Sequence, residues 1–307
     1  MEKRKLSGSN LEVTLVGLGT NNFGRRMDRE AARPVIHKAL DLGVTHFDTA
    51  DIYADGGSET IIGELLGSRR KEVVLATKFG KRMGGIDVAA RGARNYVLSA
   101  VEASLKRLQT DWIDLLWMHE PDPSTPIEET FAAVEELKKA GKVRHLAASN
   151  FSADELDVAA ATAKRMGIAG FVACQDEYSL LVRGIENTIY ASMQRNQLSL
   201  VPYFPLAGGA LTGKYREGMA SPPGSRHSDG SGRFLDPHWD KITNLTKFAE
   251  ARGHTLLELA MSWLAHRPPV ASIIAGATKV TQVEENAKSI EWALTPAEMA
   301  EIDRLTL

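Results

Sequence analysis

The sequence predicts an α/β protein folded as a (β/α)8 barrel, in which eight parallel strands alternate with helices. Short apolar runs alternate with segments of helical periodicity along the whole chain, which is the pattern of repeated βα units around a parallel sheet. Polar side chains gather at the downstream ends of these runs, and no linker or change in composition divides the 307 residues. We therefore expect a single domain over residues 1–307, since α/β barrels use such lengths as one unit.

The predicted strands are the short apolar runs that turn residues bound on both sides. They cover residues 14–17, 45–48, 73–77, 113–118, 144–148, 171–174, 198–203 and 272–275. Eight strands that are each followed by a helix favour a closed barrel, although an open doubly wound sheet uses the same local pattern.

Several of the intervening helices have start signals. Ser152 and Glu155 have the spacing of a capping box, in which a hydroxyl and a carboxylate satisfy free N–H groups at a helix start. Thr255 with Glu258, and Thr125 in the run TPIE, have the same spacing. We expect a helix to begin after each of these threonine and serine residues.

Other signals concern helix ends and buried faces. Gly43 and Gly67 stand where helices should stop. One segment places four apolar residues on a single helical face, as a helix lying on a sheet requires; they are Val97, Val101, Leu105 and Leu108.

Two segments do not fit the regular alternation of strands and helices. A helix pair at 239–250 and 295–305 exceeds the eightfold count and is predicted to be an addition to the barrel. The run 216–238, rich in Gly, Ser and Pro, is predicted to be a lid or a disordered excursion.

Polar side chains stand at the downstream end of most predicted strands. They are Asp48, Lys78, His119, Ser149, Asn150, Gln175 and Tyr203, and Gly276 ends the last strand. In a barrel all these positions open onto the face that carries active sites. Polar residues also close strands that enter ordinary turns, but the set as a whole favours a functional site.

Three of these side chains and a neighbouring tyrosine suggest proton transfer. A nearby ammonium stabilises phenolate, so Lys78 is expected to lower the pKa of Tyr53 below its free value of about 10. Asp48 would keep Lys78 charged. His119 could orient a carbonyl oxygen or share the proton, or it could be a hydrogen-bonded core residue. No nucleophile is paired with a base, so acyl transfer is poorly supported.

A metal-dependent hydrolase is the main alternative on a barrel, with Asp48, Asp51 and His119 as its ligands. The sequence gives it weak support, because no His-x-His pair ends the first strand and neither an HExxH nor a paired-carboxylate motif occurs. We therefore expect no metal, and we interpret Asp51 as a turn residue.

Two runs that contain glycine bear on nucleotide binding. GLGTNNFG fails the Rossmann fingerprint, because Asn22 occupies the third glycine position and no acidic residue closes a second strand at the expected distance. Gly17 and Gly19 are instead expected to let the backbone turn tightly over a ligand. GATK at 276–279 links the last strand to a helix, where N-terminal amides and Lys279 favour a phosphate group; an ordinary turn is the alternative.

Composition and charge exclude several classes of partner. Apolar residues make up 43% and charged residues 25%, and the net charge is -2, which gives no sign of binding to nucleic acid or to an anionic membrane. The start MEKRKLSGSN lacks the apolar core of a signal peptide, and no apolar run approaches the length of a membrane span. The single cysteine, Cys174, excludes an internal disulfide and is expected to have a packing role. We expect a cytoplasmic protein that acts on small molecules.

With these motifs in view, the chain resembles the aldo-keto reductases over nearly its whole length. The matching segments, in order, are GLGTNNFG, FDTADIY, ATKFG, DWIDLLWMH, ASNFS, CQDEYSLL, YFPLAGGALTGKY and GATKVTQVEEN. The resemblance implies a (β/α)8 barrel that binds NAD(P)H without a Rossmann domain. The chain is similar also to the potassium-channel β-subunit branch of this superfamily.

The resemblance implies a catalytic tetrad of Asp48, Tyr53, Lys78 and His119. In this tetrad Tyr53 is the general acid for carbonyl reduction, and Lys78 lowers its pKa. Asp48 supports Lys78, while His119 positions the carbonyl group. Alkoxide charge would be stabilised by Tyr53 and His119 as it forms.

The resemblance also implies a cofactor site along the same face. Ser149, Asn150 and Gln175 would bind the nicotinamide amide, and Tyr203 would stack on the ring. Further contacts, with the pyrophosphate, the adenosine phosphate and the adenine among them, are implied for Gly19, Thr20, Asn21, Asp48, Phe204, Pro205, Leu206, Ala207, Gly208, Lys214, Arg226, Gly276, Thr278, Lys279, Gln282, Glu285 and Asn286.

The expected function is NADPH-dependent reduction of aldehydes or ketones to alcohols. The charge of Lys279 favours NADPH, whereas many relatives have an arginine where Gln282 stands, so NADH is the alternative cofactor. The alternative functions are an NAD(P)-dependent sugar or alcohol dehydrogenase and a cofactor-sensing regulatory subunit with little turnover. Either a carbonyl compound or a sugar would be the substrate.

The substrate itself is not predicted. Its contacts are expected from loops around Asn22, Phe23 and Trp117 and beyond Gly213, and loop residues from one sequence do not identify a molecule. Trp117 fits a core position equally well. The sequence does not predict an oligomeric state.

Overall fold

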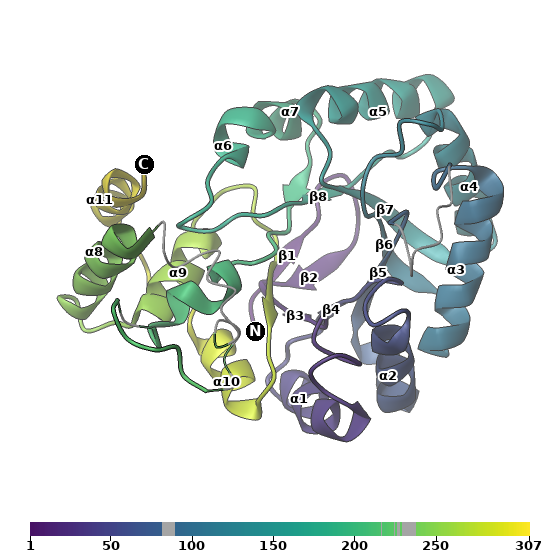
Figure 1. Cartoon of the computed structure of the whole chain (residues 1–307). Helices are drawn as coiled ribbons and strands as arrows, with labels where there is room; N and C mark the ends of the chain where they lie inside the picture. The colour runs from purple at the N-terminus through teal and green to yellow at the C-terminus, as the bar shows by residue number, and fades with distance from the viewer. Residues whose placement is uncertain (82–89, 216, 224, 226–227, 229–237) are drawn as a thin grey trace.

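The computed structural model describes residues 1–81, 90–215, 217–223, 225, 228 and 238–307. At its centre lies a parallel sheet in the order β10-β3-β4-β5-β6-β7-β8-β9, with helices arranged around it (Figure 1). The strands of this sheet are β3 (Val16–Gly19), β4 (His46–Asp48), β5 (Val74–Phe79), β6 (Ile113–Met118), β7 (Val143–Ser149), β8 (Ala173–Gln175), β9 (Ser199–Leu200) and β10 (Ile273–Gly276).

The two end strands of this order meet, so the sheet closes into a barrel. The N–H of Ala271 donates to the carbonyl oxygen of Leu200 at 2.9 Å, and the N–H of Ile274 donates to that of Pro202 at 3.1 Å. These bonds join the segment of β10 to the segment of β9. The prediction of a (β/α)8 barrel is confirmed, and the open doubly wound alternative is wrong.

Helices cover the outside of the barrel. They are α1 (Arg29–Asp41), α2 (Gly57–Leu66), α3 (Arg94–Leu108), α4 (Ile127–Lys139), α5 (Ala153–Met166), α6 (Ile185–Thr188), α7 (Tyr190–Arg195), α8 (Trp239–Glu250), α9 (Leu256–Ala265), α10 (Val280–Lys288) and α11 (Pro296–Thr306), with the 3-10 helices η1 (Gly67–Glu72) and η2 (Ala207–Thr212). Helices α8 and α11 contact each other at one side of the ring (Figure 1), as predicted for a helix pair added to the barrel.

Most of the helix signals in the sequence are confirmed. Ser152 and Thr255 complete their capping boxes at the starts of α5 and α9. The prediction for Thr125 is wrong: Pro126 caps α4 and makes no side-chain bond to it. The hydroxyl of Thr125 instead donates to Asp122 Oδ2 at 2.8 Å, because that carboxylate lies three residues away in the preceding turn.

The predicted buried face of α3 and the predicted helix ends are also confirmed. The residues that α3 buries include Val97, Val101, Leu105 and Leu108. Gly43 and Gly67 have φ values of 72° and 47°, in the left-handed region that glycine enters at little cost.

An antiparallel hairpin at the start of the chain was not predicted. Strands β1 (Lys3–Lys5) and β2 (Glu12–Thr14) pair with each other, and the hairpin lies across the ring of strands (Figure 1). The guanidinium of Arg4 donates to the carbonyl oxygen of Val270 at 2.8 Å, and the N–H of Ser7 donates to Ser199 Oγ at 2.9 Å. Since Val270 precedes β10 and Ser199 begins β9, the hairpin closes the end of the barrel opposite the predicted site.

Only the predicted strand 113–118 has the bounds that the structure gives, and the first and seventh predicted strands differ from it most. The first barrel strand begins at Val16, because Thr14 belongs to the hairpin. The predicted run 198–203 forms a strand only at Ser199–Leu200. Pro202 has no N–H to donate to a ladder, and Tyr203 pairs with Glu177 only as an isolated bridge.

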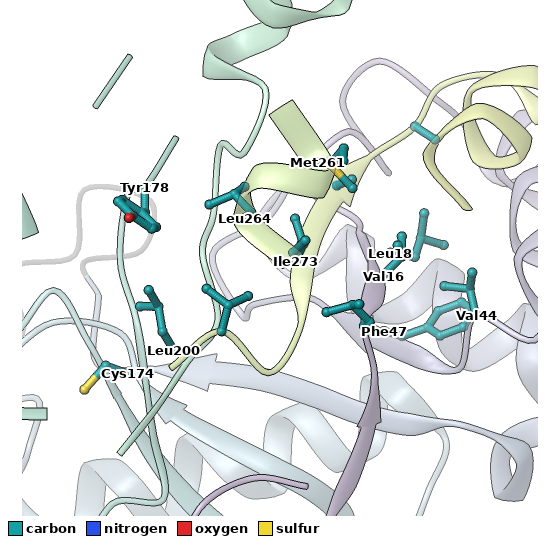
Figure 2. Packing of buried hydrophobic residues seen from close by; sticks show 14 of the residues in the cluster. Val16, Leu18, Val44, Phe47, Cys174, Tyr178, Leu200, Met261, Leu264 and Ile273 are labelled. Atoms are coloured by element: carbon teal, nitrogen blue, oxygen red, sulfur yellow. The ribbon is translucent and has the colours of Figure 1, made fainter. Parts of the chain in front are cut away.

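The hydrophobic core has an outer layer between sheet and helices and an inner layer within the barrel. In the outer layer Val16, Leu18 and Phe47 face the helices and pack near Ile273 (Figure 2). Cys174 is buried in this layer, so its expected packing role is confirmed. No helix in the described part of the chain is both long enough and apolar enough to cross a bilayer.

The glycines of β3 have a packing reason that differs from the expected turn. A Cβ atom on Gly17 would lie 2.6 Å from Ile274 Cδ1, and one on Gly19 would lie 2.9 Å from Ile274 Cγ2. Both glycines therefore leave room for the Ile274 side chain inside the barrel. Neither has a positive φ, so the expectation of a tight turn at these positions is wrong.

Candidate active site

The carboxyl ends of the strands surround a cavity of about 740 Å³. It is lined by these residues of the predicted site: Gly19, Thr20, Asn21, Asp48, Tyr53, His119, Ser149, Asn150, Gln175, Tyr203, Phe204, Pro205, Leu206, Gly208, Lys214, Gly276, Thr278, Lys279, Gln282, Glu285 and Asn286. Segments from nearly the whole chain thus meet at one face, as parallel strands in a barrel require. A cavity of this size is typical of sites for small molecules and cofactors.

A buried ion pair joins two neighbouring strands at the base of the cavity. Lys78 Nζ donates to Asp48 Oδ1 at 2.5 Å and to the carbonyl oxygen of Thr49 at 2.7 Å. Gln175 Nε2 donates to the other carboxylate oxygen of Asp48 at 2.9 Å. Burial lowers the pKa of Lys78, but the Asp48 charge and the Tyr53 hydroxyl together raise it above its usual value. Lys78 is therefore an ammonium ion throughout the neutral range.

Tyr53 lies in the loop after β4, between this ion pair and His119. The Lys78 ammonium is 5.2 Å from the centroid of the Tyr53 ring, and the imidazole of His119 meets that ring edge-on at a centroid distance of 6.2 Å. Burial raises the pKa of Tyr53 and outweighs the opposing effect of Lys78. The expected lowering of this pKa below 10 is therefore wrong for the structure described, because desolvation disfavours the phenolate. At neutral pH the phenol keeps its proton.

His119 lines the same cavity and is a neutral imidazole. Burial and the charges of Lys78 and Lys81 lower its pKa to about 2. Its Nδ1 atom is buried and has no hydrogen-bond partner in the described part of the chain. The neutral ring is therefore expected to carry its proton on Nε2. Burying an N–H group without a hydrogen-bond acceptor costs more free energy than burying a lone pair without a donor. An imidazole in this form can donate a hydrogen bond to a substrate oxygen without carrying charge.

A second network links the predicted nicotinamide residues to this centre. Tyr203 donates its hydroxyl to Asn150 Oδ1 at 2.9 Å, and Asn150 Nδ2 donates to the carbonyl oxygen of His119 at 2.9 Å and to Ser149 Oγ at 3.0 Å. Asn150 has a φ of 61°, a left-handed conformation that asparagine tolerates better than most residues. The sequence did not reveal this link, because it joins residues from three separate βα units.

The residues expected to bind phosphate line the cavity where the chain passes from β10 to α10. The N–H of Thr278 donates to Gln282 Oε1 at 2.7 Å, and Lys279 is the residue just before α10. The predicted phosphate-binding run therefore does lie at a helix start beside the cavity. Ala207 is fully buried at the start of η2 and does not line the cavity, so its expected cofactor contact is wrong. Arg226 lies outside the described residues.

Asp51 lies in a turn, as predicted, but the residue itself is buried. Its side chain is 1% exposed, and Oδ1 has no partner among the described residues. Nearby Glu59, also buried, accepts from Thr77 Oγ1 at 2.5 Å and from Arg107 Nε at 2.6 Å. No three His, Cys, Asp or Glu side chains form a metal-binding cluster in the part of the chain that is described. The metal-site alternative thus has no ligand set there.

Two of the residues expected to touch substrate belong to the core. Trp117 and Phe23 are both 0% exposed, because Trp117 fills the barrel interior and Phe23 packs in the outer layer. Asn22 does line the cavity, and so do three charged residues that the sequence did not single out: Arg26, Lys81 and Glu120. Lys81 and Glu120 could have been found from the sequence, because each stands just after a predicted barrel strand.

Comparison with known proteins gives matches over nearly the whole chain. A sequence model of the Aldo/keto reductase family matches residues 15–306. The chain is 34% identical to "Probable voltage-gated potassium channel subunit beta" of Arabidopsis thaliana, covering 99% of this chain and 96% of that protein. It is 31% identical to "L-glyceraldehyde 3-phosphate reductase" of Escherichia coli (strain K12), with 99% and 92% covered. It is 32% identical to "Aldo-keto reductase YhdN" of Bacillus subtilis (strain 168), with 99% and 93% covered.

Proposed function

Because this chain belongs to the aldo/keto reductase family, we propose that it reduces aldehydes or ketones to alcohols with NADPH, using Tyr53 as the general acid. An oxidoreductase that acts on carbonyl compounds with NAD(P)H is what the family itself indicates. The observation that carries the finer proposal is the buried Asp48–Lys78 ion pair beside Tyr53 and His119 at the cavity mouth. We also propose that residues 1–307 act as one domain.

The residues around the cavity fit the proposed cofactor. The cavity of about 740 Å³ has Lys214 and Lys279 on its wall, two cations suited to the phosphate groups of a dinucleotide. Helix α10 begins directly after Lys279, and a helix start favours a bound phosphate. When bound, the nicotinamide would supply the hydride that reduces the carbonyl carbon.

The protein's own part in the reaction is to place and protonate the carbonyl group. The neutral imidazole of His119 would hold the carbonyl oxygen, and the Tyr53 hydroxyl would give its proton to that oxygen as negative charge develops there. The phenolate left on Tyr53 would be stabilised by the Lys78 ammonium, whose charge Asp48 maintains. Water would then return a proton to Tyr53, which restores the starting state.

A turnover screen tests the proposed function. Consumption of NADPH is followed with aromatic aldehydes, aldoses, methylglyoxal, pyridoxal and glyceraldehyde 3-phosphate, the last because one relative is named L-glyceraldehyde 3-phosphate reductase. We expect turnover with at least one of these classes. Tight NADPH binding without any turnover would contradict the proposal.

That outcome would favour a second candidate, a cofactor-sensing regulatory subunit. It is supported by the 34% identity to a protein named as a probable potassium channel subunit beta. Turnover at rates typical of enzymes, about 1 s⁻¹ or faster, would favour the reductase instead.

The preference for NADPH is tested by binding. Lys279 is the cation placed at the start of α10, so Lys279→Met should weaken NADPH binding by about tenfold, as the loss of one charge-assisted hydrogen bond predicts, and leave NADH binding nearly unchanged. Lys288→Met, at the exposed end of the same helix, is the control. Equal dissociation constants of the unmodified protein for NADPH and NADH by fluorescence titration would contradict this preference.

A further inference from the structure

Three charged residues stand at the cavity mouth near Tyr53 and have no part in the proposed proton transfer. Lys81 comes two residues after β5 and Glu120 two residues after β6. Lys81 therefore lies just beyond Lys78, and Glu120 directly follows His119. Both line the cavity, as does Arg26.

Arg26 belongs to a loop that packs directly on the loop of Tyr53. A Cβ atom on Gly24, two residues before Arg26, would lie 2.7 Å from the Cβ of Ala54, the residue after Tyr53. The backbone N–H of Arg26 donates to the carbonyl oxygen of Asn22 at 2.9 Å, which fixes the turn that carries it. Arg26 is therefore held on the side of the cavity where the carbonyl group would be reduced.

Lys81 is close enough to act on the same reacting groups. Burial dominates the pKa values of Tyr53 and His119, and the charge of Lys81 lowers both. Lys81 Nζ lies 2.8 Å from Glu120 Oε1, and the two side chains are 40% and 35% exposed. An ion pair this exposed contributes little, so an incoming anion can compete for Lys81.

The charges at this end of the cavity do not cancel. Asp48 neutralises Lys78, and Glu120 neutralises Lys81. Arg26 is exposed, and within the described residues no carboxylate pairs with it. Among the described residues that line the cavity beside Tyr53, the balance is therefore a net positive charge, which a neutral substrate would leave without a counter-charge. Lys214 and Lys279, the other cations that line the cavity among the described residues, follow β9 and β10 and belong to the proposed cofactor site.

We propose that Lys81 and Arg26 bind an anionic group, a carboxylate or a phosphate, carried by the carbonyl substrate. The proposal rests on the proposed reductase function and names its substrate class. The guanidinium of Arg26 offers paired donors to such a group and Lys81 a point charge. The carboxylate of Glu120 competes with the substrate for Lys81, and an anionic substrate must displace it from the ammonium group. Glu120 therefore limits how strongly anionic substrates are favoured over neutral ones.

Matched substrate pairs test this inference. Butyraldehyde is compared with succinate semialdehyde, and glyceraldehyde with glyceraldehyde 3-phosphate, so that the two members of a pair differ chiefly in the anionic group. We expect kcat/KM for at least one anionic member to exceed that of its neutral partner by about tenfold or more. The pair with the larger ratio tells whether a carboxylate or a phosphate is preferred.

Variants separate a binding role from a structural one. Lys81→Met and Arg26→Met should each lower the anionic-to-neutral ratio of kcat/KM by about tenfold, whereas Glu120→Gln should raise it. Arg25→Met is the matched control, because Arg25 is the exposed neighbour of Arg26 and does not line the cavity; its ratio should equal that of the unmodified protein. A structural role would not give opposite signs at Lys81 and Glu120.

The possible outcomes distinguish this inference from the proposed function. Reduction of neutral and anionic members at equal kcat/KM, or a ratio that Lys81→Met leaves unchanged, would overturn the inference while the reductase function stands. No turnover of either member, together with no turnover of the other aldehydes in the screen, would contradict the reductase function. In that case the inference is tested by the binding of succinate to the NADPH complex, measured by fluorescence. If Lys81→Met binds succinate as tightly as the unmodified protein does, the inference is overturned.

Discussion

The replacement Asp51→Asn should remove a pH-dependent loss of stability that a buried carboxyl group imposes on this barrel. Asp51 is 1% exposed and its Oδ1 atom has no partner among the described residues. Burial and the neighbouring Glu59 carboxylate raise its pKa to about 7, although a hydrogen bond to the backbone of Ile52 and the charges of Arg107 and Lys78 act in the opposite direction. Asparagine has nearly the same shape and never ionises.

The size and sign of the effect follow from this pKa. The folded value of about 7 lies above the reference value of 3.8, so folding favours the protonated form. The stability is therefore fully present below about pH 4, falls as the pH rises to about 7, and is constant above it. Each pH unit in this window costs about 1.4 kcal/mol, which gives about 3 kcal/mol between pH 5 and pH 8.

Urea unfolding at pH 5, 6, 7 and 8 measures this loss. The stability of Asp51→Asn relative to the unmodified protein should rise by about 3 kcal/mol over that range. Asp55→Asn is the control, because Asp55 is an exposed residue of the same loop and has a positive φ that asparagine also tolerates. A difference between Asp51→Asn and the unmodified protein that does not change with pH would refute the reasoning.

Three further predictions concern a buried ion pair, the hydrogen bonds of Asn150 and the cap of α5. Glu59→Gln leaves Arg107 without its carboxylate partner at 2.6 Å and should cost about 3–5 kcal/mol in urea unfolding; a loss below about 1 kcal/mol, the range of exposed pairs, would contradict the buried pair. Asn150→Gly keeps the positive φ but removes the amide between Tyr203 and His119; kcat should fall even at saturating NADPH, and unchanged kcat would show that the link is dispensable. Ser152→Ala removes the cap of α5 and should cost about 1 kcal/mol in the same unfolding assay, whereas no loss would mean that water replaces it.

The barrel and the residues at its strand ends were predictable because the signals are local. Each apolar run is followed by its helix within one βα unit, and the barrel rule then places the residue after each run on one face. Asp48, Lys78 and His119 could therefore be expected to meet before any distance was known. The hairpin at Lys3–Lys5 and Glu12–Thr14 was missed because its strands have three residues each, too few to show a periodic pattern.

The features that were missed depend on pairs of residues that are distant in the chain. Gly17 is needed because of Ile274, and Arg107 finds its partner on α2; neither relation has a local signal. Trp117 lies at a strand end like a functional residue, yet its side chain points into the barrel core. The pKa of Tyr53 was predicted from one neighbouring charge, whereas burial, which depends on all surrounding segments, has the larger effect.

The most direct test of the proposed reduction is the variant Tyr53→Phe, assayed for NADPH-dependent turnover and for NADPH binding. Removing only the hydroxyl should lower kcat/KM by about 10²–10⁴-fold, the usual contribution of a general acid, while the dissociation constant for NADPH stays close to that of the unmodified protein. Tyr96→Phe, which alters a tyrosine that does not line the cavity, should change neither quantity. Near-normal turnover of Tyr53→Phe would contradict the assignment of Tyr53 as the acid.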